Sequence, residues 1–420
     1  MTNCAFTIVA KNYIGLAQIL GKSIKRHTEN VDFFIFVADE FEQEGISLEP
    51  NILIAKDTLN IDGQQWTDMS FKYDLTEFCT SIKPSCFEYI FSQGYEKAIY
   101  FDPDIYVFSS IEEIYKVLDN YDVALTPQIA GIHIDYTGEH PEWAMNVNGI
   151  FNLGFCGIRK SPKGERVVQW WKKRLSDNAF ADRSSGNFTD QKWMDWMPGL
   201  LGNESLYVFH QLGMNMAPWN YFERELISEK GRLFVKYRTE DCSDQERHPL
   251  VFIHFAGYDY EKLKQGIISR KRIENLSEYE DLRYATDIYR QEIMENKDIF
   301  DRYIQETYTY ATYDNGKKID SFHRRLYHGL TTFDNMKFEN PFSTGKDSFY
   351  EHIRHRSMIS DEPIDKINKQ NVSNISQKRK YIGILFSALF RVAGYKRYVL
   401  FVKSLYNYCR PEWHGFLIRK

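Results

Sequence analysis

The 420-residue sequence lacks an uninterrupted apolar run long enough to cross a membrane. A spanning helix needs roughly 18 or more predominantly apolar residues, and no stretch of this chain reaches that length without a charge. The first ten residues also lack the basic segment and long apolar core of a secretion signal. Hydrophobic residues nevertheless make up 43% of the chain, which is enough to bury a sizeable core. We therefore expect a folded protein with neither a membrane span nor a secretion signal.

Paired cysteines and an excess of positive charge are missing too. The 6 cysteines include no Cys-x-x-Cys pair and no spacing typical of a metal site, so reduced, buried thiols of a cytosolic protein are the interpretation we favour. The formal net charge is −5, whereas a general nucleic-acid-binding protein normally presents a basic face. We therefore expect a cytoplasmic protein without a nucleic-acid partner.

Short apolar runs alternate with helical periodicity over the first third of the chain. Residues 5–10, 33–37 and 98–101 have the pattern of buried strands, and residues 75–90 that of a helix. Pro84 must kink that helix or restart it. Further strands are expected at residues 122–126, 150–158, 206–209 and 250–255, and a long loop at residues 128–148. This alternation predicts an α/β fold with a mostly parallel, Rossmann-like sheet flanked by helices.

The composition changes near residue 265. Residues 1–265 carry the strand pattern, whereas residues 266–420 have a mostly polar, helical pattern, so we predict an α/β domain followed by a mainly helical C-terminal region. Residues 378–403 combine several basic residues and many large apolar side chains with no acid. This basic amphipathic tail fits either a helix on the anionic inner face of a cell membrane or a terminal helix packed on the protein body.

The buried strand at residues 98–101 runs directly into two carboxylates, Asp102 and Asp104. Acid pairs are common on surfaces, but the end of a strand in an α/β sheet is where ligands usually bind. One reason to hold two carboxylates there is a divalent cation that carries phosphates. Because Mn²⁺ also accepts an imidazole, His254 at the end of the last predicted strand is a candidate third ligand. The alternative for His254 is a satisfied core histidine.

Five motifs together resemble a known family. They are residues 97–107, Phe-Asn-Leu-Gly-Phe at residues 151–155, Asp-Gln at 190–191, Trp-Asn at 219–220 and His-Phe-Ala-Gly at 254–257. The first resembles the metal-binding motif of nucleotide-sugar glycosyltransferases of the GT-A fold. The set is most similar to the retaining family that contains glycogenin and bacterial lipopolysaccharide galactosyltransferases. The resemblance covers residues 5–260 and implies a UDP-sugar or similar donor and a Mn²⁺ or Mg²⁺ cofactor.

The resemblance also implies a role for each matched residue. Asp104 would be the direct metal ligand, with Asp102 next to the ribose and the metal, and His254 as the third ligand. Asn152 and Asp190 would bind the transferred sugar at its reacting face, although Asp190 could instead cap the helix that follows it. Further donor contacts are implied for Lys83, Gln191, Asn220 and Gly257. Because Lys83 stands where the family more often has arginine, bidentate phosphate binding is not expected there.

The family resemblance implies transfer of a sugar to a glycan or lipid-linked acceptor, in the synthesis of a bacterial surface polysaccharide. The family's lysine for the leaving diphosphate has no clear match, because Lys262 lies two residues later than expected and no Pro-Trp follows it. The leaving-group contact, and with it retention or inversion at the anomeric carbon, therefore stays open.

Two other functions are compatible with the same residues. A nucleotidyltransferase also uses a metal-binding acid pair on a related fold, but it normally has a Gly-rich, basic loop after the first strand, where residues 10–15 offer one lysine and one glycine. The second alternative function is that of an inactive sugar-binding or partner-binding module. It would not be expected to keep all three of Asp102, Asp104 and His254.

Overall fold

A computed structural model describes residues 3–41, 48–238, 246–265, 267, 269, 279–304, 306–360 and 375–418. The chain divides into two compact units, the first made of Met1–Ile61 and Leu75–Tyr308 and the second of Asp62–Asp74 and Thr309–Lys420. The first unit therefore extends beyond the expected boundary at residue 265. The reason is that α13 (Lys297–Ile304) packs against α1 (Ile14–His27), at the start of the chain.

A seven-stranded sheet forms the centre of the first unit, in the order β3-β2-β1-β4-β7-β6-β8. Its strands are β1 (Asn3–Val9), β2 (Val31–Val37), β3 (Ile52–Ile54), β4 (Lys97–Phe101), β6 (Val123–Leu125), β7 (Phe155–Arg159) and β8 (Leu206–Val208). Neighbouring strands run parallel except at β7, which is antiparallel to both β4 and β6. The prediction of a mostly parallel α/β sheet with a helical C-terminal region is confirmed.

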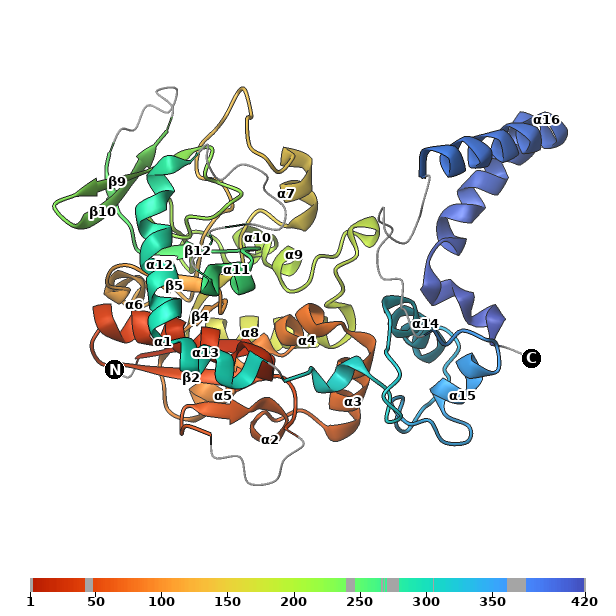
Figure 1. The fold of residues 1–420 in the computed structure, drawn as a ribbon, viewed down its shortest axis with the longest axis horizontal. Coiled ribbons are helices and arrows are strands. Elements are labelled where there is room, and N and C mark those ends of the chain that lie inside the picture. Colours follow the sequence, from red (N-terminus) through yellow and green to blue (C-terminus); the bar gives the residue numbers. More distant parts are fainter. Residues whose placement is uncertain are drawn as a thin grey trace. The chain divides into compact units, whose positions relative to one another are not determined.

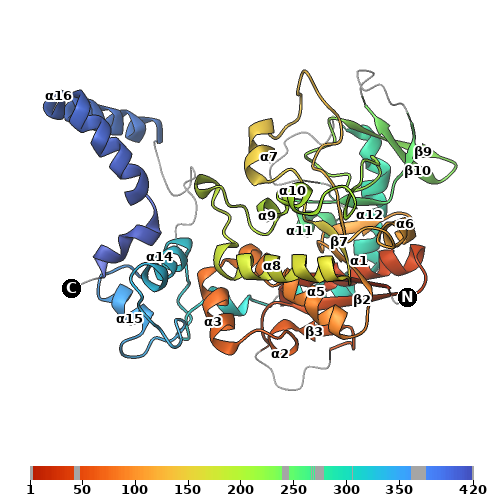
Figure 2. The same ribbon diagram turned by 180° about the vertical axis from the view of Figure 1, so that it is seen from behind.

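Helices cover both faces of this sheet (Figures 1 and 2). Helices α1 and α13 lie on one face, and α5 (Lys83–Ser92) and α8 (Pro162–Asn178) lie on the other. Strand β1 shows the alternation that makes this possible, because successive side chains of a strand point to opposite faces. Ala5 and Val9 pack in the same apolar cluster as Ile14 of α1, whereas the ring of Phe6 lies 4.8 Å from that of Phe87 in α5.

The helix expected at residues 75–90 is two helices. Helix α4 (Leu75–Ser81) ends before α5 begins, and Pro84 lies in the first turn of α5, where the missing proline N–H would have no helical partner. The predicted loop at residues 128–148 contains one helix, α7 (Glu142–Asn148), at its end.

A β-hairpin that the sequence pattern did not reveal lies at β9 (Arg224–Glu229) and β10 (Arg232–Tyr237), with β11 (His248–Pro249) beside it. Its turn is Lys230-Gly231, both with positive φ, as a two-residue hairpin loop requires. Other elements of the first unit are α2 (Ala55–Thr58), α6 (Glu112–Val117), η2 (Arg183–Ser185), α9 (Gln191–Met194), α10 (Met197–Leu201), α11 (Tyr260–Lys264) and α12 (Arg283–Glu295).

Helix α3 (Gly63–Lys72) belongs to the second unit, although in the sequence it lies between the two segments of the first unit. Around it lie α14 (Ser321–Thr332), α15 (Phe349–Arg354) and η6 (Pro411–Leu417). The ring of Phe71 lies 4.7 Å from that of Tyr327 and 5.4 Å from that of Phe349. The 5% exposed Arg324 donates hydrogen bonds to four backbone carbonyls, of Ser70, Phe71, Tyr73 and Tyr310. This guanidinium therefore ties the borrowed segment to α14.

Helix α16 (Ile375–Tyr408) bends at Gly394, whose φ of 73° is not helical (Figure 1). Its apolar side chains are exposed at consecutive positions, among them Ile382 (55%), Ile384 (56%) and Leu385 (67%). Since successive helical residues point about 100° apart, these side chains do not form the single stripe of an amphipathic helix. No helix in the described part of the chain is long and apolar enough to cross a membrane.

We predict that Arg324→Met lowers the free energy of unfolding of the second unit by about 2 kcal/mol or more, because four buried carbonyls lose a charged donor. Urea unfolding of the full chain, followed by circular dichroism, measures the change. Arg356→Met, at an exposed arginine of the same unit, is the matched control. Equal stability of the two variants would show that the guanidinium does not hold α3 in place.

Candidate active site

A tight turn after β4 and the end of another strand bring two carboxylates and an imidazole together. The N–H of Ile105 donates to the carbonyl of Asp102 (3.1 Å), which closes the turn. The chain continues as β5 (Ile105–Val107), which pairs antiparallel with β12 (Phe252–His254) so that His254 stands opposite Ile105. Nε2 of His254 consequently lies 3.0 Å from a carboxylate oxygen of Asp104 and 3.6 Å from one of Asp102.

The donor set of this cluster fits a divalent cation. One ligand atom from each of Asp102, Asp104 and His254 lies within 4.8 Å of the others. The other ring nitrogen of His254, Nδ1, lies 3.3 Å from Oδ1 of Asn152, so Nε2 is the nitrogen that faces the carboxylates. An imidazole held by an outer partner beside two carboxylates is a ligand set that Mn²⁺ accepts.

Burial and mutual charge set the electrostatics of the cluster. Burial raises the pKa of Asp102, although His254 and Lys83 oppose this effect. Burial also acts to raise the pKa of Asp104, but the charge and hydrogen bond of His254 outweigh it, so that this pKa is lowered. Burial alone would lower the pKa of His254, whereas Asp104 and Asp102 raise it. Two carboxylates thus interact with one imidazole, so the cluster favours the binding of a further positive charge.

Gly154 provides the space that the His254 ring occupies. A Cβ at this position would lie 2.5 Å from Cε1 and 2.7 Å from Nδ1 of His254, which is closer than such atoms approach without displacement. The N–H of Gly154 donates to Oδ1 of Asn152 (3.2 Å). The glycine of the residue 151–155 motif is therefore part of the cluster.

Asn152 and Gln191 form a buried amide network behind His254. Nδ2 of Asn152 donates to Oε1 of Gln191 (3.3 Å), which also accepts from the N–H of Leu153 (3.1 Å). Oδ1 of Asn152 accepts from Nδ2 of Asn215 (3.1 Å). Asn215, which the sequence motifs did not include, thus helps to fix the amide that orients His254.

Lys83 and Asp190 form a buried ion pair with exposures of 1% and 2%. Nζ of Lys83 also donates to the carbonyl of Leu153 (2.9 Å) and lies 3.9 Å from the ring centroid of Tyr100. Asp190 precedes α9, but its side chain makes no capping hydrogen bond, so the interpretation of Asp190 as a helix cap is wrong. The hydroxyl of Tyr100 donates to Asp102 (2.5 Å), which connects this pair to the cluster.

Asn220 lies within the protein rather than at an open surface, with 0% exposure. Its Oδ1 accepts from the N–H of Ala217 (2.8 Å), and its Nδ2 donates to the carbonyls of Gln128 (3.1 Å) and Asn215 (3.0 Å). These bonds hold the loop that carries Trp219, whose ring lies 5.2 Å from that of His254. The structure therefore gives Asn220 a positioning role instead of the expected direct contact with a ligand.

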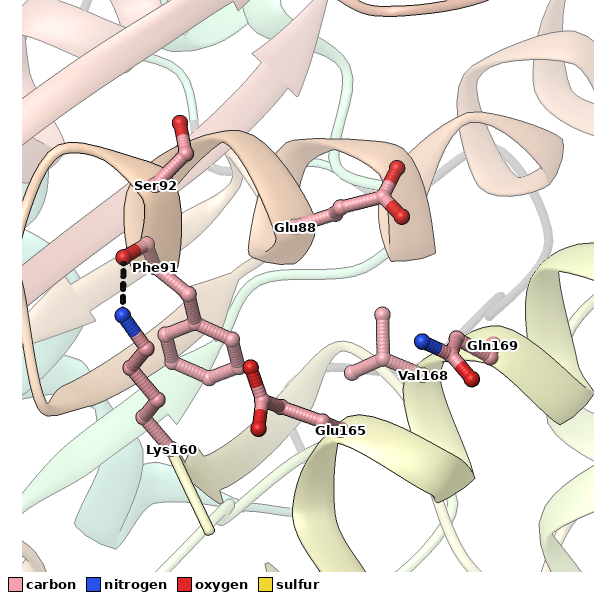
Figure 3. Close-up of a pocket in the computed structure, with 7 residues that line it drawn as sticks. All are labelled: Glu88, Phe91, Ser92, Lys160, Glu165, Val168 and Gln169. Carbon is pink, nitrogen blue, oxygen red and sulfur yellow. Dashed lines mark hydrogen bonds between the residues drawn. The ribbon is translucent and has the colours of Figure 1, made fainter. Parts of the chain in front are cut away.

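A pocket of about 710 Å³ adjoins the cluster. Three of the residues expected at the donor, Asn152, Gln191 and Gly257, line it, together with Trp219 and part of the residue 128–148 loop. A smaller pocket of about 210 Å³ lies between α5 and α8 (Figure 3). Glu88 and Glu165 line that smaller pocket, and Nζ of Lys160 donates to the carbonyl of Phe91 there (2.7 Å). It contains none of the predicted site residues.

Two tyrosines near Asp104 were missed by the sequence reasoning. Tyr13 ends the short helix η1 (Lys11–Tyr13) that follows β1, is 39% exposed, and has its ring 6.3 Å from that of Tyr260. Burial and then the charge of Asp104 raise the pKa of Tyr13, and the hydroxyl of Tyr260 interacts with Asp104. The position of Tyr13 after the first buried strand is a signal that would have found it, because ligands bind at strand ends.

Glu223 anchors the loop that covers the pocket. This fully buried carboxylate accepts from the N–H groups of Ala130 (3.0 Å) and Gly131 (3.0 Å), and it contacts Nε2 of His133 (2.9 Å). Nε of Arg224 donates to it from the other side (3.1 Å). One side chain thus fixes the start of the loop that later carries His140 and Trp143 to the pocket wall.

Comparison with known proteins gives distant matches. No protein-family model matches the chain. The uncharacterized protein YfnF of Bacillus subtilis (strain 168) is 23% identical over 296 residues, which are 69% of this chain and 91% of that protein.

Solved structures similar to the chain include glycosyltransferases, the class that the sequence motifs resemble. The galactosyltransferase LgtC in complex with donor and acceptor sugar analogs is 17% identical and covers 60% of this chain and 87% of its own, with a TM-score of 0.36. Mouse xyloside xylosyltransferase 1 is 13% identical, over 60% and 97%, with a TM-score of 0.33. The bifunctional glycosyltransferase WbbM is 14% identical, over 72% and 52%, with a TM-score of 0.38. At these identities, the activity has to be argued from the site.

We predict that Gly154→Ala weakens Mn²⁺ binding about tenfold or more, because the added methyl group displaces the His254 ring. Electron paramagnetic resonance of free Mn²⁺ during a titration gives the affinity. Gly157→Ala, in which the new Cβ would lie 3.2 Å from a methyl group of Leu118, is the control on the same part of the chain. The interpretation of the cluster as a metal site is wrong if the wild-type protein does not bind Mn²⁺, and the role of Gly154 is wrong if both variants bind it equally.

Proposed function

We propose that the protein is a metal-dependent glycosyltransferase. It transfers a sugar from a nucleotide-diphosphate sugar, such as a UDP-sugar, to a glycan or lipid-linked acceptor in the synthesis of a bacterial surface polysaccharide. The observation that carries this proposal is the meeting of Asp102, Asp104 and His254 beside a pocket lined by Asn152 and Gln191. An inactive binding module would not need to keep such a cluster assembled from two distant parts of the chain.

In this proposal Asp102, Asp104 and His254 hold Mn²⁺ or Mg²⁺. The bound cation would supply positive charge to the diphosphate, which becomes more negative as the bond to the sugar breaks. Tyr13 offers an exposed ring beside the cluster on which the base of the nucleotide can stack. No residue of the described chain is assigned to the diphosphate, and Lys262 remains an exposed residue of α11.

The amide groups of Asn152 and Gln191 bind hydroxyls of the transferred sugar, because both residues line the pocket next to His254. Asp190 acts from behind this wall. Its carboxylate is paired with Lys83, which partly balances its negative charge. The remaining negative charge favours the positive charge that the sugar develops in an oxocarbenium-like transition state. We propose retention of the anomeric configuration on the basis of the family resemblance.

Release of nucleoside diphosphate from a panel of nucleotide sugars with Mn²⁺ tests the function. We expect slow, Mn²⁺-dependent release from at least one donor, and a loss of about a hundredfold in Asp104→Asn, because a metal ligand is removed while the fold remains. Asp57→Asn, at an exposed position of α2, should keep full release.

No release from any donor, with no thermal shift on adding UDP and Mn²⁺, would overturn the transferase assignment. Formation of pyrophosphate from a nucleoside triphosphate and a sugar phosphate would instead identify a nucleotidyltransferase.

The tail supports a second part of the proposal, peripheral contact with an anionic membrane from the cytoplasmic side. The bend of α16 at Gly394 is flanked by the basic residues Arg391, Lys396 and Arg397. Exposed apolar side chains, such as Val392 (87%), lie beside them. Basic charge with exposed apolar area is the combination that binds an anionic lipid surface.

We predict that changing Arg391, Lys396 and Arg397 to glutamine weakens binding to vesicles of phosphatidylserine and phosphatidylcholine by about 3 kcal/mol, since each basic residue near such a surface contributes about 1 kcal/mol. Vesicle co-sedimentation measures the partition coefficient. The same three changes at Lys163, Arg166 and Lys173 of α8 serve as the control. Unchanged vesicle binding in the tail variant would leave α16 without a role at the membrane.

A further inference from the structure

The pocket of about 710 Å³ has a positive charge on its wall and no acid among its lining residues. This positive charge belongs to Arg183, an exposed residue of the short helix η2. Its guanidinium lies 5.7 Å from the ring centroid of Phe188, which lines the same pocket. In the described part of the chain, no carboxylate forms an ion pair with Arg183. A guanidinium in this setting is free to bind an anionic group of a ligand.

The rings of Trp143, Phe188 and Trp219 also line this pocket. Trp143, in α7, is 63% exposed, although it lines the pocket. A large ring that stays this exposed beside a concave site is typical of a ligand-binding surface. Trp219 closes the other side, against His254. Flat apolar walls with few polar groups suit the face of a sugar ring, while the polar groups fix its orientation.

Two lining residues also keep polar atoms without a hydrogen-bond partner. Nε1 of Trp219 and Oδ1 of Asn148 are sheltered from solvent and unpaired among the described residues. A buried donor or acceptor that stays unpaired destabilises the protein. One unpaired donor and one unpaired acceptor match the chemistry of hydroxyl groups, each of which can both donate and accept.

The cation proposed at Asp102, Asp104 and His254 would already serve the phosphates of the donor. The guanidinium of Arg183 comes instead from the segment between α8 and α9, and Trp143 from α7. Neither residue contacts the three cluster residues through any bond in the structure. The charge of Arg183 is therefore available to a second substrate.

We propose that the part of this pocket lined by Arg183 and Trp143 is the acceptor site, next to the transferred sugar at Asn152 and Gln191, and that it selects an acidic saccharide. The acceptor carries a carboxylate or phosphate group that pairs with Arg183, and its sugar ring lies against Trp143. The role of this saccharide as an acceptor rests on the proposed transferase function, whereas the binding of an acidic saccharide does not depend on turnover.

The test compares binding of methyl β-glucuronide, glucose 6-phosphate and the neutral methyl β-glucoside to the full chain, by titration followed with tryptophan fluorescence and ligand-observed NMR. We expect at least one acidic probe to bind tenfold or more tightly than the neutral one. Arg183→Gln should remove this preference, Arg183→Lys should keep part of it, and Trp143→Ala should weaken all three probes. Arg166→Gln, at an exposed arginine of α8 that does not line this pocket, should change nothing.

The carboxylate and phosphate probes distinguish the two kinds of acidic group. Equal binding of neutral and acidic probes, or a preference that survives in Arg183→Gln, would overturn the proposal. A dependence on Arg183 seen with UDP-glucuronate but not with the free saccharides would overturn the acceptor assignment, because the charge would then belong to the transferred sugar. Selective binding of an acidic probe without any nucleoside diphosphate release would count against the transferase while upholding the acidic-saccharide site.

Discussion

The pairing of β5 with β12 is the interaction on which the candidate site depends. Asp104 lies in the turn between β4 and β5, and His254 ends β12, far later in the chain. Three residue pairs in antiparallel register, from Phe252 opposite Val107 to His254 opposite Ile105, bring them into contact. A one-residue slip of this register would turn His254 to the opposite face. The backbone ladder therefore fixes the imidazole before any ligand is bound.

The site is otherwise held by buried amides rather than by many charges. Asn152 orients His254, Gln191 and Asn215 hold Asn152, and Asn220 holds the backbone around them. Asn152, Gln191 and Asn220 each use both the donor and the acceptor of their amide, and Asn215 donates to Asn152, so a change at one position leaves a partner unsatisfied. The buried ion pair of Lys83 with Asp190 connects to the cluster through Tyr100. Such a network favours one arrangement of the pocket wall.

Much of this arrangement could be predicted because it depends on strand patterns. The apolar run before Asp102 marks a strand end, and the last apolar strand marks His254, so both halves of the cluster could be named from the sequence. The motif at residues 151–155 also contains Gly154, whose missing side chain leaves the space that the His254 ring occupies.

Other features depend on contacts between distant residues, which local patterns do not contain. Asn220 was expected at the ligand because of its motif, yet its bonds to Gln128 and Asn215 bury it. Asn215 and Glu223 carry no local signal for the backbone groups that they hold. The hairpin of β9 and β10 was missed because its exposed residues are mostly charged and Leu226 and Val235 are its only buried apolar residues. The continuation of the first unit to Tyr308 depends on the packing of α13 on α1, a contact between residues far apart in the sequence.

The discontinuous second unit has a consequence for how the chain is made. Helix α3 leaves the ribosome long before α14 and α15, so Trp66 and Phe71 emerge without the rings of Tyr310 and Tyr327 that later cover them. Domains generally fold as units from the N-terminal end during synthesis. Here the first unit can complete its sheet while α3, which lies between α2 and α4 in the sequence, still exposes Trp66 and Phe71. The time for which Trp66 and Phe71 stay exposed is thus set by the length of chain still to be translated. Slow translation of the last third of the chain would lengthen that time.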